Sequence, residues 1–260
     1  MSPVVLIGLG LDNEKGITVQ GLEEARRADR VFAELYTNMM PDLNLHNLET
    51  MIGKKIVVLT RTQLEDENAQ EIVKDAETKT VVLLVPGDPM IATTHVSLRL
   101  ALAKRKIPSR IVHGASIVSA ICGATGLQSY KFGKSITLPQ TEHPVPKSVL
   151  ETVQDNKARG LHTLLLLDVN SDQANALTIP DALRKLAKSD SSVNEWLTVG
   201  AARIGSPSET VKAGRAKTLS GFDFGPVPHS LVFPGKLHFM EEEALKVLHG
   251  ATATDMEDKQ

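Results

Sequence analysis

The sequence predicts an α/β protein built from two α/β domains. Short segments rich in valine, isoleucine and leucine recur along the 260 residues, and helical patterns lie between them. Apolar segments without polar alternation are typical of strands covered on both faces, and their alternation with helices favours a mostly parallel sheet. We expect an N-terminal domain with a parallel sheet over 1–114 and a C-terminal domain with a mixed sheet over 115–260.

The first domain is expected to alternate strands with helices. The strands are PVVLIGLG from Pro3, KIVVLT from Lys55, TVVLLVPG from Thr80 and SRIVHGAS from Ser109. The segment VQGLEEARRADRVFAEL (19–35) carries apolar residues three and four positions apart, at Leu22, Ala25, Ala28, Phe32 and Leu35. This spacing predicts one amphipathic helix over 19–35. A further helix is expected in THVSLRLALAKRK, from Thr94.

The second domain is expected to continue the same alternation. Its strands are SITLP from Ser135, LHTLLLLDV from Leu161, LTVGAARIG from Leu197, ETVKAGRAKTL from Glu209 and HSLVFPG from His229. Its helices are PKSVLETVQDNKARG and TIPDALRKLAKSD. In the latter, Thr178 is placed to cap the helix and Pro180 falls in the first turn, where proline is tolerated.

Composition excludes several classes of protein. The formal net charge of -2 argues against a general nucleic-acid binder, because such proteins usually carry a basic excess. Cys122 is the only cysteine, so an intramolecular disulfide and a cysteine-based zinc site are both excluded. No segment reaches the roughly 20 apolar residues that a membrane-spanning helix needs. We expect a cytoplasmic protein that binds neither nucleic acid nor membranes.

The glycine turn GLG, at Gly8 and Gly10, ends the first expected strand. It would let a backbone or a ligand come close. The turn is similar to the start of a dinucleotide-binding fingerprint, but Asn13 stands where the third glycine should be. A nicotinamide or flavin site is therefore disfavoured, and a tight strand exit is the alternative to a ligand-binding turn.

The segment VPGDPMIATTH leaves a strand abruptly, with a carboxylate at the exit. Two prolines flank Gly87 and Asp88, and this combination stops the strand and forces a turn. Ligands of open parallel sheets bind at the carboxyl ends of strands, so Asp88 is a candidate ligand residue. The alternative is a turn in which Asp88 binds its own backbone. For His95, a hydrogen-bond donor at a helix start is favoured over a catalytic base.

Two more segments attract attention. HGASIVSAICGATGL, from His113, is dominated by small residues and reads either as a helix under a ligand or as close helix packing alone. VPHSLVFPGKLH places His229 at a strand entrance and Pro234 at its exit. No metal is expected, since the histidines show no close pair at a zinc spacing, and a nucleophile elbow is absent from the sequence.

Five segments resemble, in the same order, the signature segments of one family. They are IGLGLDNEKGITVQGLEEARRADRVFAELYT, VPGDPMIATTH, IVHGASIVSAICGATGLQSYKFGKS, GLHTLLLLD and PHSLVFPGKLH. The family is that of the diphthine synthases, methyltransferases of the tetrapyrrole-methylase-like fold, and the sequence resembles the archaeal branch. The resemblance extends from about Pro3 to about Leu248. It implies a homodimer in which two α/β domains hold S-adenosyl-L-methionine in the cleft between them.

The resemblance also implies a set of cofactor-binding positions. Leu11 would line the pocket beyond the glycine turn, and Asp88 and Ile91 would contact S-adenosyl-L-methionine from the PGDP loop. The remaining positions that match the family are Ser116, Ile117, Leu167, Ile204 and His229. No catalytic residue is assigned.

The implied reaction is trimethylation of the amino group of a 3-amino-3-carboxypropyl-histidine on translation elongation factor 2, with S-adenosyl-L-homocysteine as product. Orientation of an amine against an activated sulfonium methyl supplies much of the acceleration in such a reaction. Desolvation of the amine would favour loss of its proton. We therefore expect that no single base is indispensable.

Three other functions stay open at this point. A tetrapyrrole (precorrin) methyltransferase would share the fold and cofactor but act on a macrocycle. A ribosomal-RNA methyltransferase is disfavoured by the lack of a basic stripe. A non-enzymatic binding module would not gain thermal stability from S-adenosyl-L-methionine, whereas a protein that binds it in the folded state must.

Overall fold

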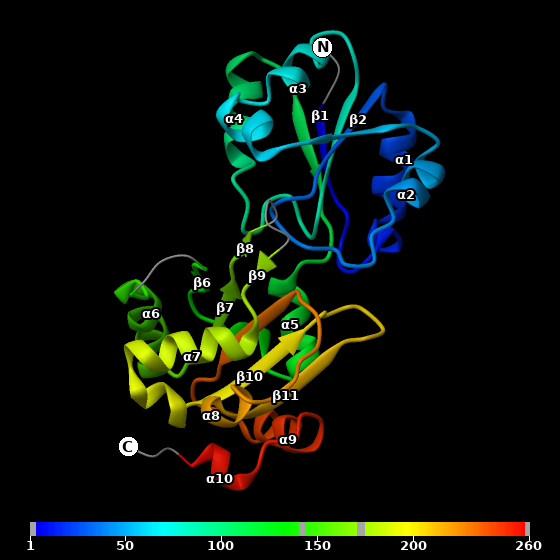
Figure 1. The fold of residues 1–260 in the computed structure, drawn as a ribbon. Helices are drawn as coiled ribbons and strands as arrows, with labels where there is room; N and C mark the ends of the chain where they lie inside the picture. Colours follow the sequence, from blue (N-terminus) through cyan, green and yellow to red (C-terminus); the bar gives the residue numbers. More distant parts are fainter. Residues whose placement is uncertain (1–3, 141–143, 171–174, 258–260) are drawn as a thin grey trace. The chain divides into compact units, whose positions relative to one another are not determined.

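The protein divides into two compact units. The structure, a computed structural model, describes residues 4–140, 144–170 and 175–257 (Figure 1). The units are Met1–Ile117 and Val118–Gln260. The division falls between the first and second residues of helix α5 (Ile117–Thr125), shortly after the boundary expected at residue 114. Each unit contains a five-stranded sheet, with two apolar cores in unit 1 and one in unit 2.

Unit 1 is a parallel sheet with helices on both faces. Its strands pair in the order β3-β2-β4-β1-β5, and they are β1 (Val4–Gly8), β2 (Arg30–Glu34), β3 (Ile56–Leu59), β4 (Val81–Val85) and β5 (Ser109–Val112). One face carries helices α1 (Val19–Arg27) and α2 (Leu45–Ile52), and the other carries α3 (Gln70–Asp75) and α4 (Val96–Lys104) (Figure 1). Short 3-10 and π-helical turns occupy Glu14–Gly16 and Thr62–Asp66.

The strands of unit 1 are buried on both faces. In β1, Val4 and Leu6 belong to the core under α3 and α4, whereas Val5 and Ile7 belong to the core under α1 and α2. The residues of β4 divide between the two cores in the same way. A strand that is covered on both faces exposes neither face to solvent, which explains why these segments are continuous apolar runs.

The single helix predicted over 19–35 is wrong. Helix α1 ends at Arg27, Ala28 has an extended backbone, and β2 begins at Arg30. Val31 packs in the core under α1 and α2, while Phe32 packs in the opposite core. Phe32 therefore matches the helical spacing only by chance. It lies in a strand, where neighbouring side chains point to opposite faces of the sheet.

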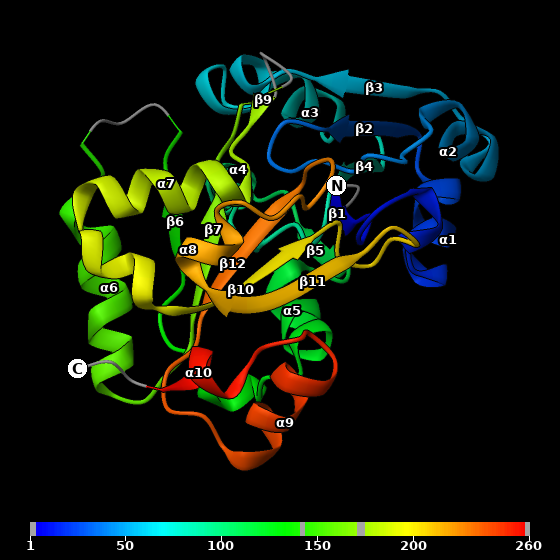
Figure 2. The ribbon, with the colours of Figure 1, turned by 60° about the horizontal axis from the view of Figure 1, so that its bottom comes forward.

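Unit 2 is built on a mixed sheet. Its strands pair in the order β11-β10-β12-β7-β6, and they are β6 (Ile136–Leu138), β7 (Thr163–Leu167), β10 (Leu197–Ala202), β11 (Thr210–Arg215) and β12 (His229–Phe233). Only β6 and β7 pair in parallel within this sheet. Figure 2 shows β11, β10 and β12 side by side. A separate pair of two-residue strands is β8 (Val169–Asn170) and β9 (Asn175–Ala176).

The helices of unit 2 differ in how well the sequence predicted them. They are α5, α6 (Lys147–Ala158), α7 (Ile179–Ser189), α8 (Ala216–Leu219), α9 (Phe239–Val247) and α10 (Ala253–Met256), with 3-10 turns at Ser129–Lys131 and Ser191–Glu195. The predicted cap of α7 is confirmed, since the Thr178 hydroxyl accepts from the Asp181 amide at 3.2 Å. The strand predicted over 209–219 is too long, because β11 ends at Arg215 and α8 follows at once.

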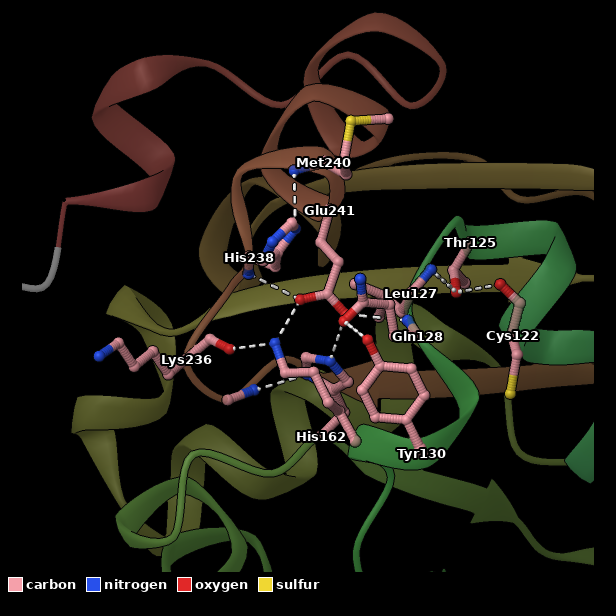
Figure 3. Close-up of polar contacts among 12 residues, drawn as sticks. Cys122, Thr125, Leu127, Gln128, Tyr130, His162, Lys236, His238, Met240 and Glu241 are labelled. Atoms are coloured by element: carbon pink, nitrogen blue, oxygen red, sulfur yellow. Dashed lines mark hydrogen bonds and ion pairs between the residues drawn. The ribbon is translucent and has the colours of Figure 1, made fainter.

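A fully buried carboxylate, Glu241, ties the start of α9 to the rest of unit 2 (Figure 3). Its Oε1 accepts from the Gln128 amide at 2.8 Å and from His162 Nε2 at 2.9 Å. Its Oε2 accepts from the His238 amide at 2.8 Å and from the Lys131 ammonium. One side chain therefore joins four donors, two of which lie more than a hundred residues before it in the chain.

The proton positions in this network follow from its partners. His162 Nδ1 accepts from the Gly235 amide at 3.0 Å, so the ring carries its proton on Nε2 and donates it to Glu241. Burial lowers the pKa of His162, which favours this neutral ring. Burial alone would raise the pKa of Glu241, but the hydrogen bonds from Lys131 and from the surrounding amides outweigh it and lower that pKa to about 2.

We expect the stability contributed by Glu241 to depend on pH in the acid range. Because the folded-state pKa lies below the ordinary value of 4.5, this contribution is complete above about pH 4.5 and is lost as the pH falls toward 2. The E241Q variant lacks the ionised group, so the difference in free energy of unfolding between wild type and E241Q should shrink from pH 6 to pH 3. Urea denaturation at each pH measures it, and a constant difference would contradict the assignment.

Candidate functional site

Four glycine residues bring the exits of β1, β4 and β5 into direct contact in unit 1. A Cβ on Gly8 would lie 2.5 Å from the Gly87 carbonyl oxygen and 2.6 Å from the Gly114 nitrogen. Gly10 and Gly87 exchange two backbone hydrogen bonds, of 3.1 and 2.8 Å, and both have positive φ angles. Only glycine allows backbones to approach this closely. The contact lies at the carboxyl edge of the sheet, where these three strands end.

Asp88 joins two of these exits. Its Oδ1 accepts from the Met90 amide at 2.9 Å, so the turn proposed from the sequence is present. Its Oδ2 accepts from His113 Nδ1 at 2.7 Å and from the Gly114 amide at 3.3 Å. The carboxylate therefore connects the loop after β4 to the loop after β5, and it is 6% exposed.

A buried histidine holds the PGDP loop in place by a hydrogen bond to its backbone. The Pro89 carbonyl accepts from the Thr93 hydroxyl at 2.6 Å and from His95 Nδ1 at 3.1 Å. His95 Nε2 lies 3.7 Å from Glu34 Oε1, and both side chains are buried at the end of β2. Glu34 in turn accepts from the Tyr36 amide at 3.0 Å. His95 acts here as the hydrogen-bond donor expected at the helix start.

The other cofactor positions expected in this unit lie on the same three exits. Leu11 is half-buried in the turn after β1, next to Asp12, which has a φ of 71°. Ile91 is 37% exposed on the PGDP loop. Ser116 is buried after β5, and Ile117 is the first residue of α5. The structure thus gathers the unit 1 positions at the carboxyl edge of one sheet.

The three positions expected in unit 2 share one edge of its sheet. Leu167 is the last residue of β7, and its neighbour Leu166 pairs with Ser230 of β12. His229 is the first residue of β12 and pairs with Ala202, the last residue of β10. Ile204 follows β10 by two residues and is 8% exposed.

The His229 ring is fully engaged within unit 2. Its Nδ1 accepts from the Ile179 amide at 3.1 Å, and its Nε2 donates to the Pro226 carbonyl at 3.0 Å. Burial lowers the pKa of His229, which favours the neutral ring that these partners require. A ligand at this position would meet the backbone or the carbon edge of the ring, since both nitrogens have protein partners.

The loop that carries Ile204 is rigidly held by its neighbour. Arg203 has a left-handed φ of 50°, and its guanidinium donates to the carbonyl oxygens of Ser208, at 2.8 Å, and Phe224, at 2.7 Å. The Gly205 amide donates to Glu209 Oε2 at 2.9 Å. These contacts fix the backbone on both sides of Ile204.

Two features of unit 1 were not predicted from the sequence. Glu34 ends strand β2, where the sequence predicts helix, and its partner His95 is distant in the chain. The pairing of His113 with Asp88 joins segments 25 residues apart, and no local pattern marks it. In the described part of the chain, no cluster of His, Cys, Asp and Glu side chains is placed to hold a metal ion. Nor is any described helix long and apolar enough to cross a membrane.

Known proteins resemble this chain over nearly its full length. The tetrapyrrole (corrin/porphyrin) methylase family matches residues 3–220. The diphthine synthase of Methanocella arvoryzae is 44% identical over 253 residues, which are 95% of this chain and 98% of the relative. That of Archaeoglobus fulgidus is 41% identical over 251 residues, 96% and 97% of the two chains.

The fold agrees with these sequence matches. A crystal structure of a diphthine synthase superposes with a TM-score of 0.88 at 40% identity, and the match covers 97% of this chain and 98% of that one. Sequence and structure therefore point to the same relatives, with no large segment left out on either side. The chain belongs to the tetrapyrrole methylase family and, within it, to the diphthine synthases.

Proposed function

We propose that this protein transfers methyl groups from S-adenosyl-L-methionine to the amino group of a 3-amino-3-carboxypropyl-histidine on translation elongation factor 2. The product is diphthine, which carries a trimethylammonium group, and its formation is a step in diphthamide biosynthesis. The observation that carries the proposal is the near-full-length similarity, in sequence and in structure, to diphthine synthases.

The carboxyl edge of unit 1 fits a ligand of this chemistry. Ile91 offers a partly exposed apolar side chain against which an adenine ring can pack. Asp12, beside Leu11, has a buried Oδ1 that lacks a hydrogen-bond partner among the described residues, and such an acceptor suits a hydroxyl or ammonium group. Leu11, Asp88, Ile91, Ser116 and Ile117 would hold S-adenosyl-L-methionine from this unit.

The family resemblance implies cofactor-binding roles for Leu167, Ile204 and His229 of unit 2 as well. When bound, S-adenosyl-L-methionine supplies a methyl group on a positively charged sulfur. The residues of the chain would orient the acceptor amine and exclude water from it, which would favour an uncharged nucleophile. The His229 ring, neutral and fixed by two hydrogen bonds, would add no charge to such a binding site.

We also propose a homodimer in the cytoplasm, as the family resemblance implies. A net charge of -2 supports a protein acceptor rather than nucleic acid. Light scattering of the purified protein after size exclusion would give the mass in solution. A mass near 28.1 kDa, that of one chain, would contradict the dimer.

Mass spectrometry tests the reaction directly. Elongation factor 2 that carries the 3-amino-3-carboxypropyl-histidine is incubated with the protein and S-adenosyl-L-methionine, and the modified peptide is weighed. A gain of three methyl groups supports the proposal. No gain on that peptide, together with methyl transfer to a precorrin, would instead make the protein a tetrapyrrole methyltransferase.

Replacement of Asp88 should weaken binding of S-adenosyl-L-methionine. The D88A variant loses three hydrogen bonds that organise the exits of β4 and β5, and a buried hydrogen bond of this kind is worth about 1 to 3 kcal/mol. We expect the dissociation constant from calorimetry to rise roughly 5- to 150-fold. Asp29→Ala is the matched control, because Asp29 also accepts a backbone amide, that of Thr80, but just before the start of β2. Equal affinities for D88A and wild type would remove Asp88 from the site.

A further inference from the structure

His113 is held by a buried carboxylate while most of its ring stays open to solvent. Its Nδ1 lies 2.7 Å from Asp88 Oδ2, and its side chain is 69% exposed against 7% for the side chain of Asp88. The next residue, Gly114, donates its amide to the same oxygen. Two consecutive residues therefore bind one carboxylate, and this fixes the position of the ring.

The partners of the His113 ring determine where its proton lies. A carboxylate oxygen accepts hydrogen bonds, so Nδ1 carries the proton that it donates to Asp88. The lone pair of the neutral ring is then on Nε2, which has no hydrogen-bond partner among the described residues. A carboxylate that orients an imidazole and leaves Nε2 free is an arrangement in which histidine acts as a general base.

Three other buried histidines do not offer such a nitrogen. His229 uses both ring nitrogens within unit 2, and His162 does the same with Glu241 and Gly235. His95 is 1% exposed, and its Nε2 faces the buried carboxylate of Glu34. Among these side chains, His113 combines an oriented ring with an accessible lone pair.

The position of His113 suits an acceptor that arrives from solution. It follows β5 directly and precedes Gly114, which belongs to the glycine contact. This contact lies at the carboxyl edge of the sheet, where ligands of parallel sheets bind. We propose that His113 is the general base that removes a proton from the acceptor amine, with Asp88 as its orienting residue. This inference rests on the proposed methyltransferase function, and it opposes the expectation from the sequence that no single base is indispensable.

The step balances without any further reactant. An aliphatic ammonium group has no lone pair, so one of its N–H bonds must break before it can act as a nucleophile. The proton passes to His113 Nε2, and the electron pair stays on the amine nitrogen. That nitrogen then bonds to the methyl carbon, while the carbon–sulfur bond breaks and its electrons pass to the sulfur. The imidazolium returns its proton to water before the next round.

The test compares H113N with wild type. Asparagine can still donate a hydrogen bond to Asp88, but it cannot take up a proton at neutral pH. We expect its methyl-transfer rate at pH 7 to fall about 100-fold or more, as is usual for loss of a general base. The dissociation constant of S-adenosyl-L-methionine, from calorimetry, should stay within about twofold. Added imidazole, or alkaline buffer in which the amine loses its proton to solvent, should restore a large part of the rate.

Chemical modification gives a second readout that does not depend on turnover. Diethylpyrocarbonate acylates accessible neutral imidazole, so peptide mass spectrometry should find His113 modified, and the elongation factor substrate should slow this reaction. His46→Asn, in the exposed part of α2, is the matched control and should leave the methyl-transfer rate unchanged.

The outcomes separate this inference from the function on which it rests. A fully active H113N, a loss of cofactor binding as large as the loss of rate, or an unreactive His113 would each overturn the role as base. If wild type itself transfers no methyl group to the modified elongation factor, the proposed function fails and the inference falls with it.

Discussion

Replacement of Glu241 by alanine should lower the free energy of unfolding by about 3 to 5 kcal/mol, the usual cost of breaking a buried ion pair. The carboxylate is fully buried and accepts from two side chains and two backbone amides. Without it, the His162 N–H loses its acceptor in the interior of unit 2, and the Lys131 ammonium keeps only the Lys236 carbonyl. An unpaired buried donor costs more than the net value of the bond that it made.

Urea denaturation at pH 7, followed by circular dichroism, measures the effect. Glu242 is the matched control, because it is the next residue in α9 but lies on the surface, 3.8 Å from Lys246. Such exposed pairs contribute at most about 1 kcal/mol, so E242A should change stability little. Equal losses for the two variants would mean that the buried network adds nothing beyond ordinary helix stability.

Gly114→Ala should damage both the stability of unit 1 and its binding of S-adenosyl-L-methionine. The new Cβ would lie 2.5 Å from the Gly87 carbonyl oxygen and 2.9 Å from the Gly8 carbonyl carbon. These are backbone atoms, so the clash is relieved only if the strand exits move apart. Overpacking of this kind costs about 1 to 3 kcal/mol, and the displaced loop carries Asp88. We expect a lower unfolding midpoint and at least a tenfold weaker affinity by calorimetry.

Gly123→Ala provides the comparison. Gly123 lies in α5, and a Cβ there meets no atom within 4 Å. Alanine is favoured over glycine in a helix by about 1 kcal/mol, so this variant should be as stable as wild type or slightly more stable. Wild-type affinity in G114A would show that the glycine contact does not position the site.

The buried strands of unit 1 could be predicted because their composition alone identifies them. VVLIG and VVLLV are covered on both faces and contain no polar residue. Strand β2 could not be predicted in this way, because its sequence RVFAE has charged ends. It also follows helix α1 with no glycine or proline between the helix and the strand. The order of the strands also depends on pairings between distant segments, which no local pattern reports.

The candidate site was predicted in part. PGDP marked a strand exit because proline and glycine restrict the backbone locally, and Asp88 lies there as expected. The partnership of Asp88 with His113 depends on β4 and β5 ending at the same edge with β1 between them. A tertiary arrangement of this kind appears in the sequence only as two separate segments.

The backbone bonds between Gly10 and Gly87 also limit how this protein can be altered by loop exchange. The two turns are held together by these two hydrogen bonds, so an insertion in either turn would disturb the pairing of both. A designer who wants to change the acceptor should therefore leave both turns at their present length. The segment after β3, which is absent from the glycine contact, is the better place to graft new sequence.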